Sequence, residues 1–355
     1  MLKASFKKYI LEFKLPAGTS RGILKTKEAW FILLHNNGKF GIGECGMLRG
    51  LSIDDCPDYE SKLQWVCDNI SLGLENLYNE VVEFPSIQMG LETAFKSLVA
   101  ENPFQIFPSS FSKGEASIPI NGLVWMGDKA FMKKQIYEKL KMGFRCIKMK
   151  IGSIDFKTEL ELLHSLRKEF SPDDIELRVD ANGAFAVEDA MEKLKWLSEL
   201  QLHSIEQPIA KGQWVQMARL CEQTPLPIAL DEELIGIFNS EEKVRLVETV
   251  KPQFIILKPS FIGGFKGSDD WASIADAHGV GWWVTSALES NVGLNAISQY
   301  TFTKNSKLPQ VLGTGSLFTN NIDSPLKVRN GSIEYDTNVP WNMDLLNFNN
   351  ITGCL

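Results

Sequence analysis

The chain has 355 residues and carries 44 acidic against 37 basic side chains, so its formal net charge is −7. This acidic balance argues against nucleic acid as the main partner, because phosphate binding needs a basic face. The sequence holds only four His, so any metal chemistry has to rely on carboxylates. A chain of this length can bury enough surface to fold without disulfides or a structural metal.

Export signals and membrane spans are not expected. The charged N-terminal residues are not followed by the apolar stretch of a signal peptide, and no run of about 18 apolar residues occurs. The six Cys are scattered and form no C-x-x-C pair. This favours reduced thiols in a cytoplasmic protein.

The first 110 residues predict an α+β unit. Three segments have the character of strands, and Asn36-Asn37-Gly38 between the last two is a hairpin turn signal. These segments are 9–15, 29–35 and 39–44. Helical patterns follow at about 58–80 and 86–100, and a stretch rich in Pro and Ser then marks a break.

A regular alternation of strands and helices begins near residue 117. Eight short apolar runs start 25 to 30 residues apart, and amphipathic segments separate most of them. The runs are 118–124, 145–151, 175–180, 202–206, 227–231, 254–258, 281–285 and 309–313. This period predicts a parallel sheet closed into a (β/α)8-type barrel. An open doubly wound sheet is the rival, but the Gly-rich phosphate turn that it requires after its first strand is absent.

Charged residues recur at the ends of five consecutive runs, each one strand–helix unit after the last. They are Lys150, Asp180, Glu206, Asp231 and Lys258. Lys148 shares the face of Lys150, because side chains alternate along a strand. Barrel active sites are built at the C-terminal ends of the strands. A single acidic residue at a strand end is usually a helix cap or a solvated side chain. Five charged residues at successive strand ends together predict an active site.

The arrangement suits removal of a proton from a carboxylate substrate. Three carboxylates from neighbouring strands would bind a hard divalent cation, Mg²⁺ by default and Mn²⁺ as the other possibility. One lysine could take the α-proton while the cation and the opposite lysine stabilise the enediolate. We expect the cation and Lys148 to lower the pKa of Lys150 toward that of a useful base.

These motifs resemble the enolase superfamily, in particular its muconate-lactonising branch. The matching segments are Lys148-Met149-Lys150, Asp180-Ala181-Asn182, Ile205-Glu206-Gln207-Pro208, Asp231-Glu232 and Leu257-Lys258-Pro259. The resemblance implies a (β/α)7β TIM-like barrel at 111–324, an N-terminal α+β capping domain at 1–110, and a C-terminal segment at 325–355 that completes the capping domain. It also implies Lys150 as base, Lys258 as enediolate stabiliser, and Asp180, Glu206 and Asp231 as Mg²⁺ ligands.

Within the branch the chain is most similar to o-succinylbenzoate synthases of menaquinone biosynthesis. Supporting segments are 18–22, 41–44 and 285–293. This family dehydrates 2-succinyl-6-hydroxy-2,4-cyclohexadiene-1-carboxylate. An N-succinylamino acid racemase, or another racemase or cycloisomerase of the branch, is the alternative enzyme. A catalytically dead barrel that serves as a binding module is the alternative outside catalysis. Glu233 is a departure, since many relatives have Ser there.

Contacts to the substrate are harder to assign than the metal ligands and lysines. Candidates are Asn182, Ser286, Ser290, Arg21 and Thr314. Ser286 and Ser290 could instead cap the following helix. Arg21, like Arg49, lies in a polar loop of the capping domain, where it could meet a substrate carboxylate or only solvent. The sequence does not indicate the oligomeric state.

Overall fold

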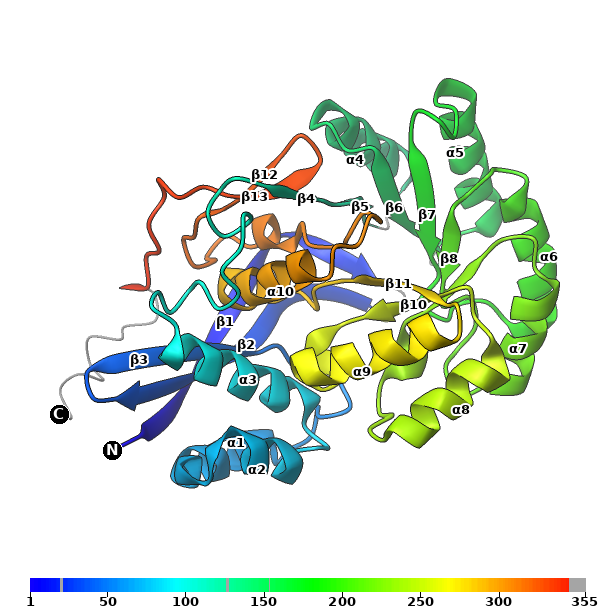
Figure 1. Ribbon diagram of the computed structural model, residues 1–355. Helices are drawn as coiled ribbons and strands as arrows, with labels where there is room; N and C mark the ends of the chain where they lie inside the picture. The colour runs from blue at the N-terminus through cyan, green and yellow to red at the C-terminus, as the bar shows by residue number, and fades with distance from the viewer. Residues whose placement is uncertain (20–21, 126–127, 153, 345–355) are drawn as a thin grey trace.

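The computed structural model describes residues 1–19, 22–125, 128–152 and 154–344. An antiparallel sheet with its helices lies beside an α/β barrel (Figure 1). No helix among the described residues is long and apolar enough to span a membrane.

The N-terminal part is built on three antiparallel strands in the order β1-β2-β3. They are β1 (Lys3–Thr19), β2 (Gly22–Asn36) and β3 (Lys39–Cys45), followed by α1 (Tyr59–Asp68), η1 (Ile70–Leu72), α2 (Gly73–Glu80) and α3 (Pro85–Val99). The predicted turn forms with positive φ at both Asn37 and Gly38, as a type I′ hairpin requires. A Cβ at Gly43 would lie 1.9 Å from the Gly90 carbonyl oxygen, so α3 can pack directly on the sheet only because Gly stands there.

The barrel sheet has the order β11-β10-β9-β8-β7-β6-β5, and all its pairs are parallel. Its strands are β5 (Gly122–Val124), β6 (Cys146–Lys150), β7 (Glu176–Asp180), β8 (Ser204–Glu206), β9 (Ile228–Leu230), β10 (Phe254–Leu257) and β11 (Gly281–Val284). The α-helices are α4 (Lys129–Lys141), α5 (Phe156–Glu169), α6 (Val187–Ser198), α7 (Trp214–Gln223), α8 (Ser240–Val250), α9 (Gly264–Ala277) and α10 (Asn291–Thr303). Short 3₁₀ turns are η2 (Glu232–Leu234), η3 (Pro259–Phe261) and η4 (Thr314–Leu317).

The eighth predicted run closes the barrel with two bridges. Gln310 pairs with Ile120 at one edge of the sheet, and Val311 pairs with Thr285 at the other. The first run is divided, because its start forms β4 (Ser117–Pro119) in another sheet. The predicted barrel is therefore confirmed, with bridges in place of a full eighth strand.

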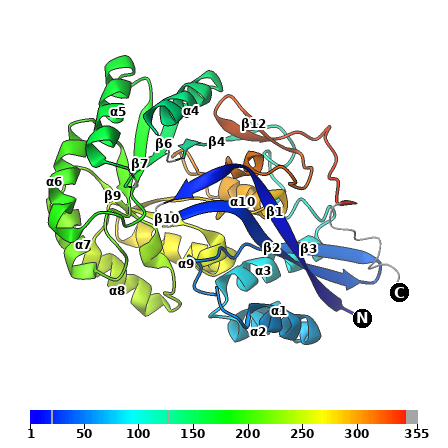
Figure 2. The same ribbon diagram turned by 180° about the vertical axis from the view of Figure 1, so that it is seen from behind.

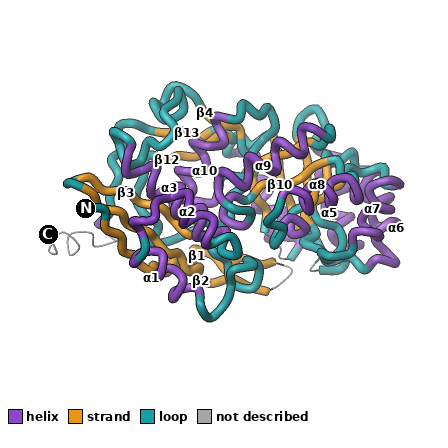
Figure 3. The backbone as a smooth tube through the Cα atoms, turned by 60° about the horizontal axis from the view of Figure 1, so that its bottom comes forward, coloured by secondary structure: helices purple, strands orange, loops and turns teal. Residues whose placement is uncertain are grey.

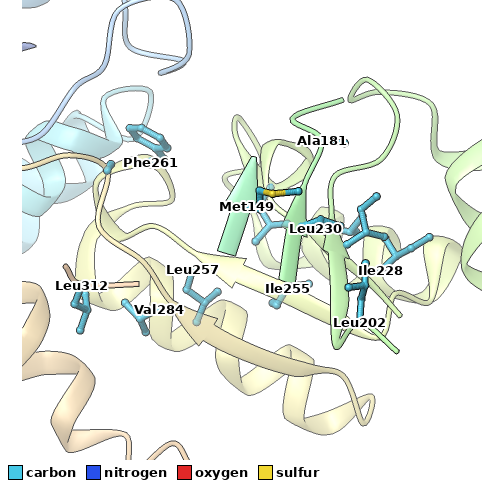
Figure 4. Packing of buried hydrophobic residues seen from close by; sticks show 14 of the residues in the cluster. Met149, Ala181, Leu202, Ile228, Leu230, Ile255, Leu257, Phe261, Val284 and Leu312 are labelled. Atoms are coloured by element: carbon cyan, nitrogen blue, oxygen red, sulfur yellow. The ribbon is translucent and has the colours of Figure 1, made fainter. Parts of the chain in front are cut away.

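Alternation along the strands separates two apolar cores. Residues such as Met149, Leu230 and Ile255 belong to the large core that includes buried residues of the outer helices (Figure 4). Ala229, Ile256, Trp283 and Val311 form a small separate cluster. Because Lys148 and Lys150 flank Met149 on the chain, they point to the opposite face of the sheet, toward the barrel interior.

The C-terminal segment returns across the molecule. Strands β12 (Leu326–Arg329) and β13 (Ser332–Tyr335) form a small sheet with β4. Trp341 then stacks on Phe104 with ring centroids 4.4 Å apart. The end of the described chain lies near the strands of the N-terminal sheet (Figure 2). The division at residues 110 and 324 stays a prediction.

Candidate active site

Three of the predicted residues lie side by side on adjacent strands. Lys150 of β6 is in register with Asp180 of β7, and Asp180 is in register with Glu206 of β8. Asp231 and Lys258 directly follow β9 and β10. The even spacing in the sequence thus brings these five side chains to one end of the barrel.

Ion pairs connect the lysines with the carboxylates. Asp180 Oδ2 lies 3.0 Å from Lys148 Nζ and 2.8 Å from Lys150 Nζ. Lys148 also pairs with Glu206, and Lys258 pairs with Asp231. None of these side chains is more than 13% exposed, so the charges interact with little screening by water.

The pKa directions follow from burial and from these partners. Burial acts to lower the pKa of Lys148 and of Lys258, but neighbouring carboxylates outweigh it and raise both. Burial acts to raise the pKa of Asp180, yet Lys148 and Lys150 hold it well below its ordinary value. Burial and repulsion from Asp180 raise the pKa of Glu206. Lys148 and Lys258 are therefore cations at neutral pH.

Asn182 contacts the Lys150 side chain from one side. Its Oδ1 accepts a hydrogen bond from Lys150 Nζ at 2.6 Å, and its Nδ2 donates to Glu232 Oε1 at 3.0 Å. Its backbone is left-handed, with φ 45°, a conformation that Asn tolerates better than most residues. The predicted contact thus positions Lys150, and Glu232 is a participant that the strand-end spacing does not reveal.

A hydrogen-bond network through Gln207 and Glu233 joins the ends of β8 and β9. Gln207 Oε1 accepts from the Asp231 backbone N–H at 3.1 Å, and its Nε2 donates to Glu233 Oε2 at 3.0 Å. Glu233 Oε1 accepts from the Gly212 N–H at 2.8 Å. Glu233, the residue that departs from the family pattern, therefore braces loops beside two proposed metal ligands.

A pocket lies over these groups, between the barrel and the N-terminal part. Lys148, Lys150, Asp180, Asn182, Glu206 and Lys258 form its polar floor. Its walls are largely apolar and include Leu24, Leu48 and Leu51 from the N-terminal part and Leu123, Trp125 and Phe261 from the barrel. The β1–β2 hairpin that carries Leu24 reaches toward the barrel (Figure 3).

The structure separates the substrate candidates. Ser286 and Thr314 line the pocket, with their hydroxyls 2.6 Å apart. Ser290 is fully buried outside the pocket lining, where its hydroxyl accepts from the Val292 N–H and so caps α10. Arg21 lies outside the described residues. Arg49 lines the pocket but donates to Glu28 and Asp55, both at 2.6 Å.

The carboxylate set fits a hard cation. Among the described residues, no three acidic, His or Cys side chains lie close enough together to bind a metal ion in the observed conformation. The three carboxylates pair with lysine ammonium groups instead. However, Glu206 Oε1 is buried without a hydrogen-bond partner. Three adjacent strands supply only oxygen donors, the ligands that Mg²⁺ prefers. Asp180, Glu206 and Asp231 remain the proposed ligands.

The barrel, its capping sheet and the paired lysines define a protein of the enolase superfamily. A family model described as "Enolase C-terminal domain-like" matches residues 132–339, and the chain belongs to this superfamily. It is 42% identical to the o-succinylbenzoate synthase of Desulfotalea psychrophila over 93% of this chain and 98% of that protein.

Two further relatives extend the comparison. The crystal structure of MenC from D. psychrophila superposes with a TM-score of 0.84 at 39% identity, covering 94% of this chain and 99% of that one. The N-succinylamino acid racemase of Thermus thermophilus is 32% identical over 43% of this chain and 39% of that protein.

Proposed function

We propose that this chain is an o-succinylbenzoate synthase, a carbon–oxygen lyase that dehydrates 2-succinyl-6-hydroxy-2,4-cyclohexadiene-1-carboxylate to 2-succinylbenzoate. The observation that carries the proposal is the placement of Lys150 and Lys258 on the floor of one pocket with largely apolar walls. The relative at 42% identity has this activity in its name and matches nearly end to end.

Lys150, as a neutral amine, takes the proton from the carbon that bears the ring carboxylate. The breaking C–H bond leaves its electrons in an enediolate, and these electrons then expel the hydroxyl group. The resulting Lys150 ammonium returns the proton to that hydroxyl, so water leaves and the ring becomes aromatic. Asp180 Oδ2 and Asn182 Oδ1 lie 2.8 and 2.6 Å from Lys150 Nζ and orient it for both transfers.

Two fixed cations favour the enediolate over the bound substrate. The raised pKa of Lys258, in which its carboxylate neighbours outweigh burial, keeps it an ammonium beside the developing negative charge. Lys148 is likewise held charged on the floor. When bound by Asp180, Glu206 and Asp231, Mg²⁺ supplies further positive charge to the substrate carboxylate, as in other members of the superfamily.

The pocket walls bind the remainder of the substrate. Leu24, Leu48, Leu51 and Trp125 offer apolar surface to the ring and the succinyl chain and exclude water from the floor. The hydroxyls of Ser286 and Thr314 are placed to hydrogen-bond a polar atom of the substrate. The partner that this site suits is a small carboxylate molecule.

A racemase of N-succinylamino acids is the second candidate. Proton removal and return need the same two lysines, and a racemase relative matches part of the chain at 32% identity. A binding module without catalysis is disfavoured, because the lysines, the acids and the pocket are all in place. The cytoplasmic location stays a prediction.

One experiment separates the two activities. The purified chain with Mg²⁺ is incubated with the cyclohexadiene carboxylate, and the aromatic product is followed by absorbance. In parallel, an N-succinylamino acid is incubated in deuterated water, and α-proton exchange is followed by NMR. Rapid aromatisation supports the synthase. Proton exchange without aromatisation would replace it with the racemase.

A further inference from the structure

A buried charged cluster joins the N-terminal sheet to the barrel beside the pocket. It consists of Lys27 from β2, Glu44 from β3, and Glu289 between β11 and α10, and none of the three is more than 2% exposed. Buried charges are expensive unless they are paired, so this cluster calls for a role. The mechanism above uses none of its members.

Glu289 bridges two walls of the pocket with one carboxylate. Its Oε1 accepts from Ser260 Oγ at 2.6 Å, and its Oε2 accepts from the Ala287 N–H at 2.6 Å. Ser260 lies in η3, two residues after Lys258, and Ala287 itself lines the pocket. The carboxylate therefore ties the segment that carries the second lysine to the segment that follows β11.

The bridged wall is strained. Leu288, between Ala287 and Glu289, lines the pocket with a left-handed backbone at φ 64°. Such a conformation is uncommon for a bulky residue and persists only where surrounding contacts enforce it. The hydrogen bond from the Ala287 N–H to the Glu289 carboxylate closes a turn around Leu288 and helps to enforce its left-handed backbone.

Lys27 of the N-terminal sheet is the third buried member of this cluster. Its Nζ is buried and has no hydrogen-bond partner among the described residues. Burial lowers the pKa of Lys27, while Glu289 and then Glu44 act to raise it. Glu44 is otherwise occupied, since it accepts from the Ser290 and Gly293 N–H groups at the start of α10.

The backbone of the N-terminal part also touches the bridge. A Cβ at Gly46 would lie 2.6 Å from Ser260 Oγ and 2.9 Å from Glu289 Oε1. No side chain fits there, so the loop after β3 packs directly on the carboxylate. Two residues later the same loop lines the pocket with Leu48.

We propose that Glu289 is a positioning residue that clamps the Lys258 segment to the Ser286–Leu288 wall, and that the loop after β3 packs on this clamp at Gly46. The clamp makes the docking of the N-terminal sheet a condition for correct active-site geometry. This inference rests on the proposed function for its kinetic consequence only. The clamp itself is independent of which substrate the pocket takes.

The test compares three substitutions at the clamp. Glu289→Ala removes both hydrogen bonds, and we expect kcat to fall roughly 100-fold, as for a small misplacement of catalytic groups. Glu289→Gln can keep both bonds, because its amide oxygen accepts from Ala287 and its amide nitrogen donates to Ser260, so most of kcat should return. Ser260→Ala removes only the hydrogen bond from Ser260 to Glu289. The chain should still fold, and kcat should fall by less than in Glu289→Ala.

Thermal unfolding tests the packing of the N-terminal part on the clamp separately. Gly46→Ala should lower both Tm and kcat, because its Cβ would lie 2.6 Å from Ser260 Oγ and 2.9 Å from Glu289 Oε1. Glu92→Ala is the matched control. Glu92 also joins the N-terminal part to the barrel, through the Phe265 N–H, but it lines no pocket wall, so only Tm should fall.

Hydrogen exchange provides a readout without substrate. The Ala287 amide, in the segment 284–291, should exchange much faster in Glu289→Ala than in the wild type. If the wild type fails to form 2-succinylbenzoate, the proposed function falls while exchange and Tm still judge the clamp. An unchanged kcat in Glu289→Ala, unchanged exchange at Ala287, or an unchanged kcat in Gly46→Ala would overturn the clamp.

Discussion

Replacing Glu92 by Gln should make the stability of the protein less dependent on pH. Glu92 of α3 accepts hydrogen bonds from the Phe265 N–H at 2.5 Å and the Lys266 N–H at 3.2 Å, in the first turn of α9. Gly263, which precedes this helix, makes no side-chain cap, so the cap comes from the N-terminal part of the chain. Glu92 is only 8% exposed.

The size of this pH-dependent contribution to stability follows from the pKa of the Glu92 carboxyl. Burial raises the pKa of Glu92 from 4.5 to about 7, against the two backbone N–H groups, which lower it. A raised pKa means that the folded state binds the proton more tightly than the unfolded state. The protonated Glu92 therefore contributes to the free energy of unfolding in full below about pH 4.5, and this contribution is lost as pH rises to about 7. At 1.36 kcal/mol per unit, the loss is about 3 kcal/mol.

A neutral Gln cannot lose this stabilisation. For a chain of 355 residues, about 3 kcal/mol corresponds to about 4 °C in Tm. We therefore expect the Tm of Glu92→Gln, relative to wild type, to rise by about 4 °C between pH 4.5 and pH 8. Differential scanning calorimetry across this range measures it.

The control is Glu83→Gln, which removes an exposed carboxylate just before the same helix. It should follow the wild-type pH profile throughout. If Glu92→Gln also tracks the wild type from pH 4.5 to pH 8, then burial does not raise the pKa of Glu92, and the argument fails.

Three further predictions concern the site. Exhaustive chelation should abolish dehydration, and Mg²⁺ or Mn²⁺ should restore it; full activity after chelation would remove the proposed metal site. Asp180→Asn should lower Mg²⁺ affinity, measured by calorimetry, because it removes a proposed ligand. It should also lower activity, because Lys148 and Lys150 lose their shared partner. Unchanged affinity would contradict its role as a ligand. Ser286→Ala and Thr314→Val should raise KM by roughly 10-fold each, the effect of about one lost hydrogen bond; an unchanged KM would exclude substrate contact.

The barrel was predictable because its signal is periodic. Strands start every 25 to 30 residues, and five consecutive ones end in a charged side chain, so the sequence alone predicts that Lys150, Asp180 and Glu206 lie side by side, as their register shows. The eighth run forms only isolated bridges, at Gln310 and Val311, and a strand-length expectation from the sequence does not anticipate this.

Contacts between the two parts of the chain carry no such period. Ser290 and Glu44 are 246 residues apart, so nothing local distinguishes a capping Ser from one that contacts substrate. The same holds for Glu289, whose partners lie in segments that only the folded chain brings together. Gln207 and Glu233 follow strand ends, yet their mutual bond depends on the neighbouring strand.

The formation of 2-succinylbenzoate by wild type and by Lys150→Met, measured side by side with Mg²⁺ present, tests the central claim most directly. The account predicts rapid aromatisation by the wild type and a loss of at least about 100-fold in the variant, the minimum expected for a general base. Lys157→Met, at an exposed lysine on α5, should match the wild type. Equal rates for the wild type and Lys150→Met would contradict the assignment of Lys150 as the base.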